Sequence, residues 1–239
     1  MRSPAMTFVT SFFVGFLAVA PAAAQTTLPY DHVHLAAPDQ AAAVEWYQRT
    51  FGGETTPEGK DRLLFGKTRF IWLKSDTAKP SAGTAIDHIA FSVADKTPGF
   101  LIDPWGVRIE ILNDPQRRGF HHVHLRSTDP AATLAWYRQR FGGEKTTFRN
   151  EDALKYGDML VMVEKSATAP APSVGRALDH VGWRVTDLDK ILADLAGIKV
   201  LQGVTNLQLA NGPVRYSFVE DPWGAKIELV QRQVSGVQR

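Results

Sequence analysis

The residues His32-Val33-His34-Leu35 open a stretch that continues through Trp46-Tyr47 to Phe51-Gly52-Gly53-Glu54. The same stretch returns from His122-Val123-His124-Leu125 to Phe141-Gly142-Gly143-Glu144, with 13 of 23 aligned positions identical. Both halves also close alike, with Asp103-Pro104-Trp105-Gly106 before Glu110 and Asp221-Pro222-Trp223-Gly224 before Glu228. The chain is therefore an internal duplication that repeats histidines and closing glutamates as well as apolar residues.

Composition excludes several classes of function. The 239 residues contain no cysteine, so neither disulfides nor thiolate chemistry is available. The formal net charge is only +2 and the basic residues are scattered, with Arg117-Arg118 the densest pair, so nucleic acid is not an expected partner. Each half is long enough to bury a core. We expect units at 29–113 and 120–231, with 232–239 as a tail.

The first 24 residues are typical of a secretory signal peptide. Arg2 precedes a largely apolar run from Thr7 to Ala20, and Ala22-Ala23-Ala24 is a small-residue cleavage site. The apolar run is too short to span a bilayer, although an uncleaved anchor is the alternative. We expect cleavage near Ala24, export to the periplasm or the medium, and no membrane attachment afterwards.

Hydrophobic periodicity predicts two βαβββ modules in each half. In the second half, Thr128 or Asp129 can cap a helix that has Pro130 in its first turn and Gly142 past its end. Its apolar face matches that of the first-half helix. Short strands are expected at 62–65, 69–74, 153–156 and 159–164, and new strands open at 87 and 179. The fold class is α+β, with curved mixed sheets that form a cleft.

The second module of the first half is shortened. His180 and Asp221 are 41 positions apart, whereas His88 and Asp103 are only 15 apart. The first half therefore lacks 26 residues, about a helix and one or two strands. We expect that this module cannot form a complete curved sheet.

The repeated polar residues offer metal ligands. Because side chains alternate along a strand, His32 and His34 point to one side, as do His122 and His124. Asp87 and Asp179 each precede a histidine and should face away from it. Two imidazoles and one carboxylate are available in each half, namely His32, His88 and Glu110, and then His122, His180 and Glu228. Such sets suit Fe(II), Mn(II), Zn(II) or Ni(II) with positions left for substrate.

Each motif also has an ordinary structural interpretation. A strand histidine is often only a satisfied polar residue, and Asp-Pro-Trp-Gly is first of all a tight turn. Nevertheless, these four histidines and two glutamates occupy matching positions in the modules. Burying them without a partner would cost free energy. Four aromatic residues could wall an apolar pocket, although core packing is their commoner use: Trp183, Tyr216, Phe218 and Trp223.

The strand-opening histidines, the Trp-Tyr…Phe-Gly-Gly helix and the Asp-Pro-Trp-Gly-x-x-Ile-Glu ending resemble the vicinal oxygen chelate superfamily. That group includes glyoxalase I, methylmalonyl-CoA epimerases, extradiol dioxygenases, fosfomycin-resistance proteins and bleomycin-resistance proteins. The resemblance covers nearly all of 30–112 and 121–230. It implies ligands from the first strand of a module pair, the opening strand of the second module and the final strand.

The resemblance also indicates which residues of the glyoxalase I and dioxygenase patterns have no counterpart in this chain. Glyoxalase I and the epimerases take a further ligand from the last strand of the first module, a position that we assign to Trp72 and Val163. Glu164 is adjacent but is expected to face the other way. The dioxygenase pattern expects a tyrosine ten positions before the metal glutamate, where this chain has Phe218. Tyr216 could substitute for it.

The pairing of modules decides the site. In some members one unit supplies all the ligands, which would give His122, His180 and Glu228. In others the modules are exchanged, which would give His32, His180 and Glu228. His180 and Glu228 belong to the better site either way, and Glu228 could also move protons. His124 or His34 could act as a base or as a partner of the ligands.

Two functions from different classes remain. The first is a divalent-metal enzyme that acts on a small oxygenated substrate as a lyase, isomerase or ring-cleaving dioxygenase. The second is a metal-free binding protein of the bleomycin-resistance type, which generally lacks ligand residues. The complete ligand sets favour the enzyme. Because the two repeats can mimic a dimer, either a monomer or a homodimer is expected.

Overall fold

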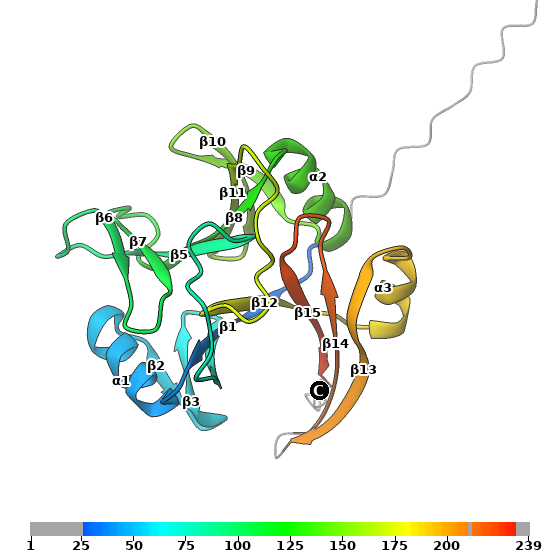
Figure 1. The fold of residues 1–239 in the computed structure, drawn as a ribbon, viewed down its shortest axis with the longest axis horizontal. Coiled ribbons are helices and arrows are strands. Elements are labelled where there is room, and N and C mark those ends of the chain that lie inside the picture. The colour runs from blue at the N-terminus through cyan, green and yellow to red at the C-terminus, as the bar shows by residue number, and fades with distance from the viewer. Residues whose placement is uncertain (1–25, 210–211, 233–239) are drawn as a thin grey trace, which may run out of the picture.

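The computed structural model describes residues 26–209 and 212–232. The predicted signal peptide and residues 233–239 of the expected tail lie outside the described residues. No helix among the described residues has the length and apolar character needed to cross a membrane. The described residues form three helices, and Figure 1 shows that they lie at the outside of the strands.

The first repeat contains two modules of unequal size. The first module has the expected order of elements: β1 (Tyr30–Ala37), α1 (Gln40–Phe51), β2 (Glu54–Thr56), β3 (Gly59–Phe65) and β4 (Thr68–Lys74). The second contains only strands: β5 (Ile86–Ser92), β6 (Gly99–Ile102) and β7 (Arg108–Leu112).

The second repeat has two complete modules. The third module of the chain contains β8 (Gly119–Ser127), α2 (Pro130–Phe141), β9 (Glu144–Phe148), β10 (Glu151–Tyr156) and β11 (Met159–Lys165). The fourth contains β12 (Leu178–Arg184), α3 (Leu188–Asp194), β13 (Lys199–Leu209), β14 (Gly212–Glu220) and β15 (Lys226–Arg232). By comparison, the second module lacks counterparts of α3 and β13, which confirms its predicted shortening. Its edge strand β6 leaves Phe100 and Ile102 more than half exposed.

Each sheet combines modules from both repeats. One sheet has the strand order β13-β14-β15-β12-β1-β4-β3-β2, and the other has β6-β7-β5-β8-β11-β10-β9. The repeats join where β1 pairs antiparallel with β12 and where β5 pairs antiparallel with β8. The sequence units 29–113 and 120–231 therefore do not form one sheet each. Both sheets mix parallel and antiparallel pairs, as expected for the α+β class.

Local signals in the sequence explain the helices. Asp129 accepts a hydrogen bond from the Ala132 backbone N–H, Pro130 lies in the first turn, and Gly142 ends α2 with a positive φ of 75°. At α1, Asp39 accepts a hydrogen bond from the Ala42 backbone N–H, and Gly52 ends the helix with a positive φ of 78°. The hydroxyls of Tyr47 and Tyr137 each donate to the aspartate of an Asp-Pro-Trp-Gly turn, Asp103 and Asp221, at 2.8 Å.

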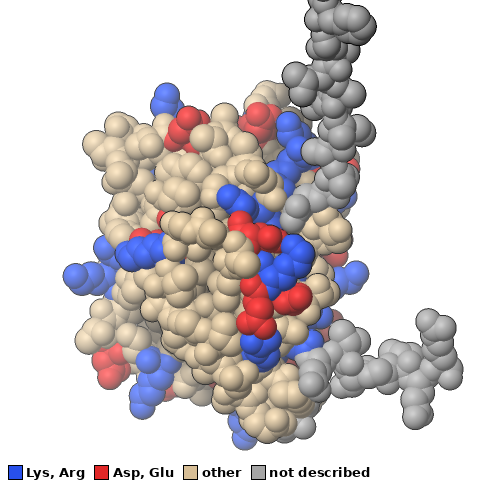
Figure 2. All heavy atoms as spheres, turned by 90° about the vertical axis from the view of Figure 1, so that its right-hand side faces the viewer, with Lys and Arg blue, Asp and Glu red and all other residues tan. Residues whose placement is uncertain are grey.

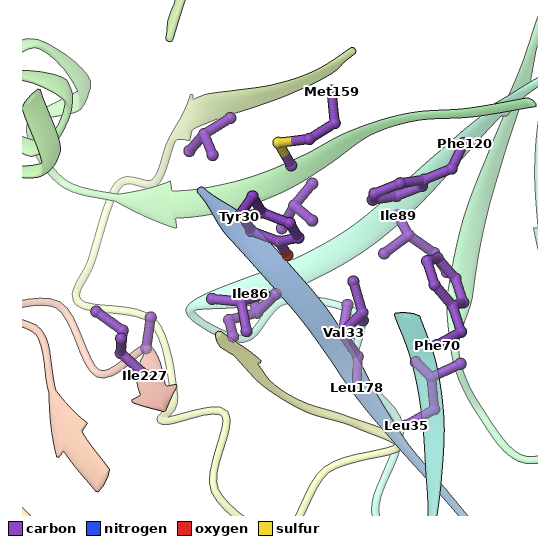
Figure 3. Close-up of a cluster of buried hydrophobic side chains, with 14 of the residues drawn as sticks. Tyr30, Val33, Leu35, Phe70, Ile86, Ile89, Phe120, Met159, Leu178 and Ile227 are labelled. Atoms are coloured by element: carbon purple, nitrogen blue, oxygen red, sulfur yellow. The ribbon is translucent and has the colours of Figure 1, made fainter. Parts of the chain in front are cut away.

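The main core lies between the two sheets. Val33 and Leu35 are fully buried and alternate along β1 with His32 and His34, so they point to the opposite side of the strand. Figure 3 shows these residues with Ile86 and Ile89 of β5 and Leu178 of β12, so both sheets contribute to one cluster. The histidines therefore lie on the face of each sheet that turns away from the core.

The face shown in Figure 2 carries acidic and basic side chains intermixed in one cluster, surrounded largely by uncharged residues. A basic stripe of the kind that binds nucleic acid is not seen on this face.

Candidate metal centres

Four residues from three strands of the first sheet converge, and we call them the first centre. His32 and His34 come from β1, His180 from β12 and Glu228 from β15. His34 lies directly opposite His180, and Gly182 lies between His32 on one neighbouring strand and Glu228 on the other. Because Gly182 has no side chain, the His32 imidazole fits above it; a Cβ there would lie 2.2 Å from His32 Cε1.

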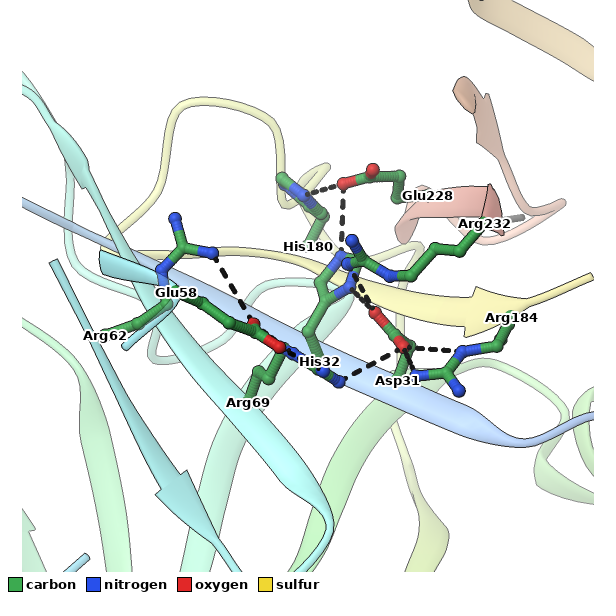
Figure 4. Close-up of polar contacts among 9 residues, drawn as sticks. All are labelled: Asp31, His32, Glu58, Arg62, Arg69, His180, Arg184, Glu228 and Arg232. Atoms are coloured by element: carbon green, nitrogen blue, oxygen red, sulfur yellow. Dashed lines mark hydrogen bonds and ion pairs between the residues drawn. The ribbon is translucent and has the colours of Figure 1, made fainter. Parts of the chain in front are cut away.

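The donor atoms of the first centre all lie within 4.8 Å of one another. Glu228 Oε2 is 3.1 Å from both His32 Nε2 and His180 Nε2, and Figure 4 shows the carboxylate reaching between the two rings. The His34 ring stands 4.2 Å from the His180 ring, measured between centroids. The cluster can therefore present three imidazoles and one carboxylate to a single ion.

The second sheet holds an equivalent cluster, the second centre, formed by His88, Glu110, His122 and His124. His88 lies opposite His124 on β8, and Ala90 lies between His122 and Glu110. Glu110 Oε2 is 3.3 Å from His122 Nε2 and 3.7 Å from His88 Nε2. The second centre is thus assembled in the same way even though its closing module is shortened.

The structure decides between the two pairing arrangements. Neither His32, His88 and Glu110 nor His122, His180 and Glu228 form a cluster, so the assignment of one set to each repeat is wrong. The exchanged arrangement brings His32 to His180 and Glu228. The physical reason is that β1 pairs with β12, and β8 with β5, so that each sheet crosses the boundary between repeats.

His34 and His124, which we expected to act beside the ligands, have donor atoms within the clusters themselves. Strand alternation predicted the face on which they lie. It could not predict that the neighbouring antiparallel strand would place His180 opposite His34, and His88 opposite His124.

Acidic neighbours orient three of the rings. Asp31, Asp87 and Asp179 lie 2.9, 2.7 and 2.6 Å from Nδ1 of the histidine that follows each of them. The expectation that Asp87 and Asp179 face away from their histidines is therefore wrong, because the carboxylates reach around the backbone to the ring. A carboxylate on Nδ1 directs Nε2 toward the centre, an arrangement typical of metal-binding histidines.

The ring of His122, which is the equivalent of His32 in the second repeat, does not follow this pattern. His121 precedes His122, and their Nδ1 atoms are 2.9 Å apart. His121 Nε2 in turn lies 3.3 Å from Asp114. The first-strand histidine of the second centre therefore contacts an imidazole where the other three contact a carboxylate.

Sequence reasoning missed a cluster of arginines around Asp31. Arg184 donates to Asp31 Oδ1 at 3.1 and 2.6 Å, and Arg232 donates to Oδ2 at 3.1 Å. Arg69 lies 3.5 Å from Oδ1. Figure 4 shows Asp31 between these guanidinium groups and His32. No linear signal marks the cluster, because its members come from β1, β4, β12 and β15.

Burial and charge set unequal pKa values around the two centres. Burial alone would lower the pKa of His32, but Glu228 and Asp31 raise it to about 9. Burial would likewise raise the pKa of Glu228, yet His32 and His180 hold it well below its usual range. Burial lowers the pKa of His122 to about 4 and that of His124 to about 2. Glu228 is therefore an ionised acceptor at neutral pH.

Unlike Glu228 of the first centre, the glutamate of the second centre has an arginine bound to its carboxylate. Arg149 Nη1 donates to Glu110 Oε1 at 2.9 Å, while Glu110 Oε2 faces the histidines. Arg149 and Asn150 form the turn between β9 and β10 and have positive φ values of 50° and 66°. Left-handed backbone is uncommon for arginine, so this turn is strained where it places the guanidinium.

The structure places the four aromatic residues that were predicted to wall a pocket in different surroundings. Phe218 packs against His180 with ring centroids 5.0 Å apart, and Tyr216 follows on the same face of β14. Trp183 is wrong as a pocket residue, because it is fully buried in the core and stacks on Phe141. Trp223 packs against Trp136 of α2, so it too belongs to the scaffold.

The assignment of Trp72 and Val163 to a further ligand position is also wrong. Trp72 pairs with Leu35 and Val163 with Leu125, on the core side of each sheet. The residues opposite His34 and His124 are Ile71 and Met162. Glu164 shares the face of Met162 and lies 3.6 Å from Arg126. The error is one residue of register, which reverses the face of a strand.

The donor set fits a divalent ion. Among the described residues, His34 Nδ1 and both nitrogens of His124 are buried imidazole nitrogens without a hydrogen-bond partner. The Nε2 atoms of His32, His88 and His122 have only an ion-pair contact with Glu228 or Glu110. Buried polar atoms are rarely left without a partner, since each costs free energy. A metal held by three imidazoles and a carboxylate would bind one nitrogen of each ring, and such donors suit Fe, Mn, Zn or Ni.

Comparisons with known proteins agree with this architecture. Residues 119–229 match the family model Glyoxalase/Bleomycin resistance protein/Dioxygenase superfamily. Glyoxalase I from Zea mays is similar in fold, with a TM-score of 0.63, 20% identity, and coverage of 86% of this chain and 92% of that one.

A protein of Bacillus subtilis subsp. subtilis, which its name proposes to be a dioxygenase, is also similar in fold. It has a TM-score of 0.58 and 14% identity, with coverage of 88% of this chain and 87% of that one. No curated protein matches the chain.

Proposed function

Because this chain belongs, through residues 119–229, to the glyoxalase/bleomycin resistance protein/dioxygenase superfamily, we propose that it is a divalent-metal-dependent enzyme for a small substrate with two adjacent oxygens. The observation that carries the proposal is the convergence of three buried imidazoles and one carboxylate in each sheet, around Glu228 in one and around Glu110 in the other. Fold likeness alone would not support it, because this fold hosts many functions.

His32, His34, His180 and Glu228 would hold the ion of the first centre. A bound divalent ion supplies Lewis-acid polarisation of substrate oxygens. Asp31 and Asp179 keep the His32 and His180 rings oriented through Nδ1. Glu228 is ionised at neutral pH. When it leaves the ion, its carboxylate can take a proton from a substrate carbon and return it, the task of a lyase or isomerase.

The surroundings of the first centre suit a compact substrate. Phe218 covers one side of His180, and the Lys226 ammonium stands 4.3 Å from the centre of the Phe218 ring. The Glu228 side chain is only 11% exposed. These residues exclude water from Oε2 and offer an apolar surface beside the polar atoms of a ligand.

Metal content tests the proposal. Protein purified without a histidine tag should bind one equivalent of Fe, Mn, Zn or Ni at each centre by elemental analysis. His180→Ala should lose the ion of the first centre, whereas the exposed variant Arg49→Gln, made as the control, should keep both. Metal-free protein with an intact fold after exposure to all four ions would refute an enzyme and favour sequestration of a small molecule.

A ring-cleaving dioxygenase is the second candidate, because His32, His180 and Glu228 form within the first centre a two-histidine, one-carboxylate set of the kind that holds Fe(II) in oxygenases. Oxygen uptake with catechols by the iron-loaded protein separates the candidates. Consumption of oxygen supports the dioxygenase. Exchange of a carbon-bound hydrogen of a 2-hydroxycarbonyl compound without oxygen uptake supports the lyase or isomerase.

We also propose export, on the pattern of residues 1–24, as either a monomer or a homodimer. The mass of the mature protein recovered from the periplasm would locate the cleavage near Ala24, and sedimentation would give the oligomeric state. An intact N-terminus in the cytoplasm would refute export.

A further inference from the structure

A cavity of about 870 Å³ opens where β1 and β8 begin. Its walls are residues 27–30 before and at the start of β1, residues 116–120 before and at the start of β8, and the turns that follow β3 and β10. These segments are equivalents in the two repeats, so the cavity lies between the repeats. None of the eight residues of the two metal centres lines it.

The walls of the cavity carry an excess of positive charge. Five basic residues line it, whereas the acidic lining residues are Glu54 and Asp158; the basic ones are Lys67, Arg117, Arg118, Lys155 and Arg184. Arg117, Lys155 and Arg184 pair with acidic residues that do not line the cavity. Among the described residues Lys67 has no ion-pair partner, and Arg118 donates to the neutral side chain of Asn113, so these two residues are the ones open to an anion. The cavity is therefore complementary to an anion.

Five aromatic residues are among the uncharged residues that line the cavity: Tyr30, Phe51, Phe65, Phe120 and Tyr156. Figure 3 shows Tyr30, Phe120 and Met159, which also line the cavity, at one end of the core cluster. A volume of this size accommodates an organic molecule, and ring-lined pockets with a few polar groups are the usual form of ligand sites.

We propose that this cavity binds an amphipathic organic anion, with a flat apolar body against the rings and a negatively charged group among the basic residues. This site is separate from the metal centres and does not depend on them for its ligand.

One residue connects the cavity to the first centre. Arg184 lines the cavity and donates to Asp31 Oδ1, and Asp31 Oδ2 lies 2.9 Å from His32 Nδ1. An anion in the cavity competes with Asp31 for Arg184, while Arg232 keeps its contact with Oδ2. The negative charge of Asp31 beside His32 is then less fully neutralised, which favours a cation at the first centre. By linkage, a metal ion would strengthen anion binding by the same factor.

The anion site is tested on metal-free mature protein with 8-anilinonaphthalene-1-sulfonate, an aromatic sulfonate whose fluorescence reports its environment. One saturable site is expected, with affinity that falls as salt rises. The variant Lys67→Glu/Arg118→Glu should weaken binding about tenfold or more. Arg49→Glu/Lys190→Glu changes the net charge equally at exposed sites outside the cavity and should have no effect.

Equal affinity in the two double variants would overturn the proposal, as would non-saturating binding to the exposed apolar residues of β6 and β13. Circular dichroism checks that both variants are folded. Because no metal is present, this result is independent of the proposed enzymatic function.

The coupling, in contrast, rests on the proposed function. The dye should tighten Zn²⁺ binding at the first centre by about fivefold, and Arg184→Gln should abolish that change. An unchanged Zn²⁺ affinity in the presence of bound dye refutes the coupling. Absence of any Zn²⁺ binding refutes the proposed function and leaves the anion site standing.

Discussion

His34 and His180 face each other across the antiparallel strands β1 and β12, with ring centroids 4.2 Å apart, although they belong to different repeats. The same relationship joins His124 to His88 in the other sheet. Each centre therefore takes two histidines from the opening strand of one repeat, and a histidine and a glutamate from the closing module of the other.

This exchange predicts how ions are lost from double variants. His32→Ala/His180→Ala should remove one ion per chain, because both residues belong to the first centre. His88→Ala/His180→Ala should affect both ions, since it disables one ligand in each centre. Equilibrium dialysis followed by elemental analysis measures the stoichiometry. Loss of both ions from the first variant would contradict the exchanged arrangement.

Gly182→Ala should impair the first centre selectively. The added Cβ would lie 2.2 Å from Cε1 and 2.3 Å from Nε2 of His32, so the ring must move away from Glu228. We expect metal affinity to fall about tenfold or more, since ligand placement decides affinity. Calorimetric titration in a His88→Ala background isolates this centre.

The control for that experiment is Gly203→Ala on β13, where a Cβ would meet nothing within 4 Å. Its metal affinity should equal that of the parent. If the two glycine variants bind the ion equally well, the space above Gly182 does not position His32.

Arg149→Gln should strengthen the second centre. The guanidinium on Glu110 Oε1 repels a cation bound by the same carboxylate, so its removal should raise metal affinity about fivefold at low salt. Arg149→Lys retains the charge and should change less. The measurement is calorimetric titration in a His180→Ala background. A weaker second centre in Arg149→Gln would show instead that the arginine positions Glu110.

Metal binding at the first centre should release a proton. The pKa of His32 is raised to about 9 in the metal-free protein, so its ring is protonated at neutral pH and must lose that proton to ligate. Metal affinity should therefore rise with pH up to about 9. Titrations in buffers of different ionisation enthalpy count the protons.

Asp31→Asn removes one of the charges that raise the His32 pKa, so this variant should release a smaller fraction of a proton at neutral pH. Affinity that does not change between pH 6.5 and 9 would contradict the proton competition.

Asp221 should make stability depend on pH in weakly acidic solution. Burial raises its pKa to about 6 from the 3.8 of an unperturbed aspartate. The folded state thus holds a proton that the unfolded state has lost, and the contribution to stability falls as pH rises from about 4 to 6. The shift corresponds to about 3 kcal/mol.

Asp221→Asn should flatten this part of the profile in denaturant titrations, while the exposed variant Asp152→Asn should retain it. Identical profiles for the parent and Asp221→Asn would contradict the assignment.

Local patterns explain why some residues could be predicted. Asp129 and Gly142 each bond to a backbone group within four positions of themselves, so the helix that they delimit could be predicted from the sequence. The faces of His32 and His34 follow from strand alternation, a property of each strand by itself. Trp72 was assigned to the wrong face because the register between β1 and β4 depends on packing between strands that are far apart in the sequence.

The duplication, the α+β class, the shortened second module and the residue types of both centres could all be derived from the amino-acid sequence. These follow from repeated motifs and from periodicities set by the backbone. Three features could be known only from the folded chain: the pairing of β1 with β12 and of β8 with β5, the entry of His34 and His124 into the clusters, and the three arginines around Asp31. These depend on which distant strands become neighbours, and that choice is made by burial of the core between the two sheets.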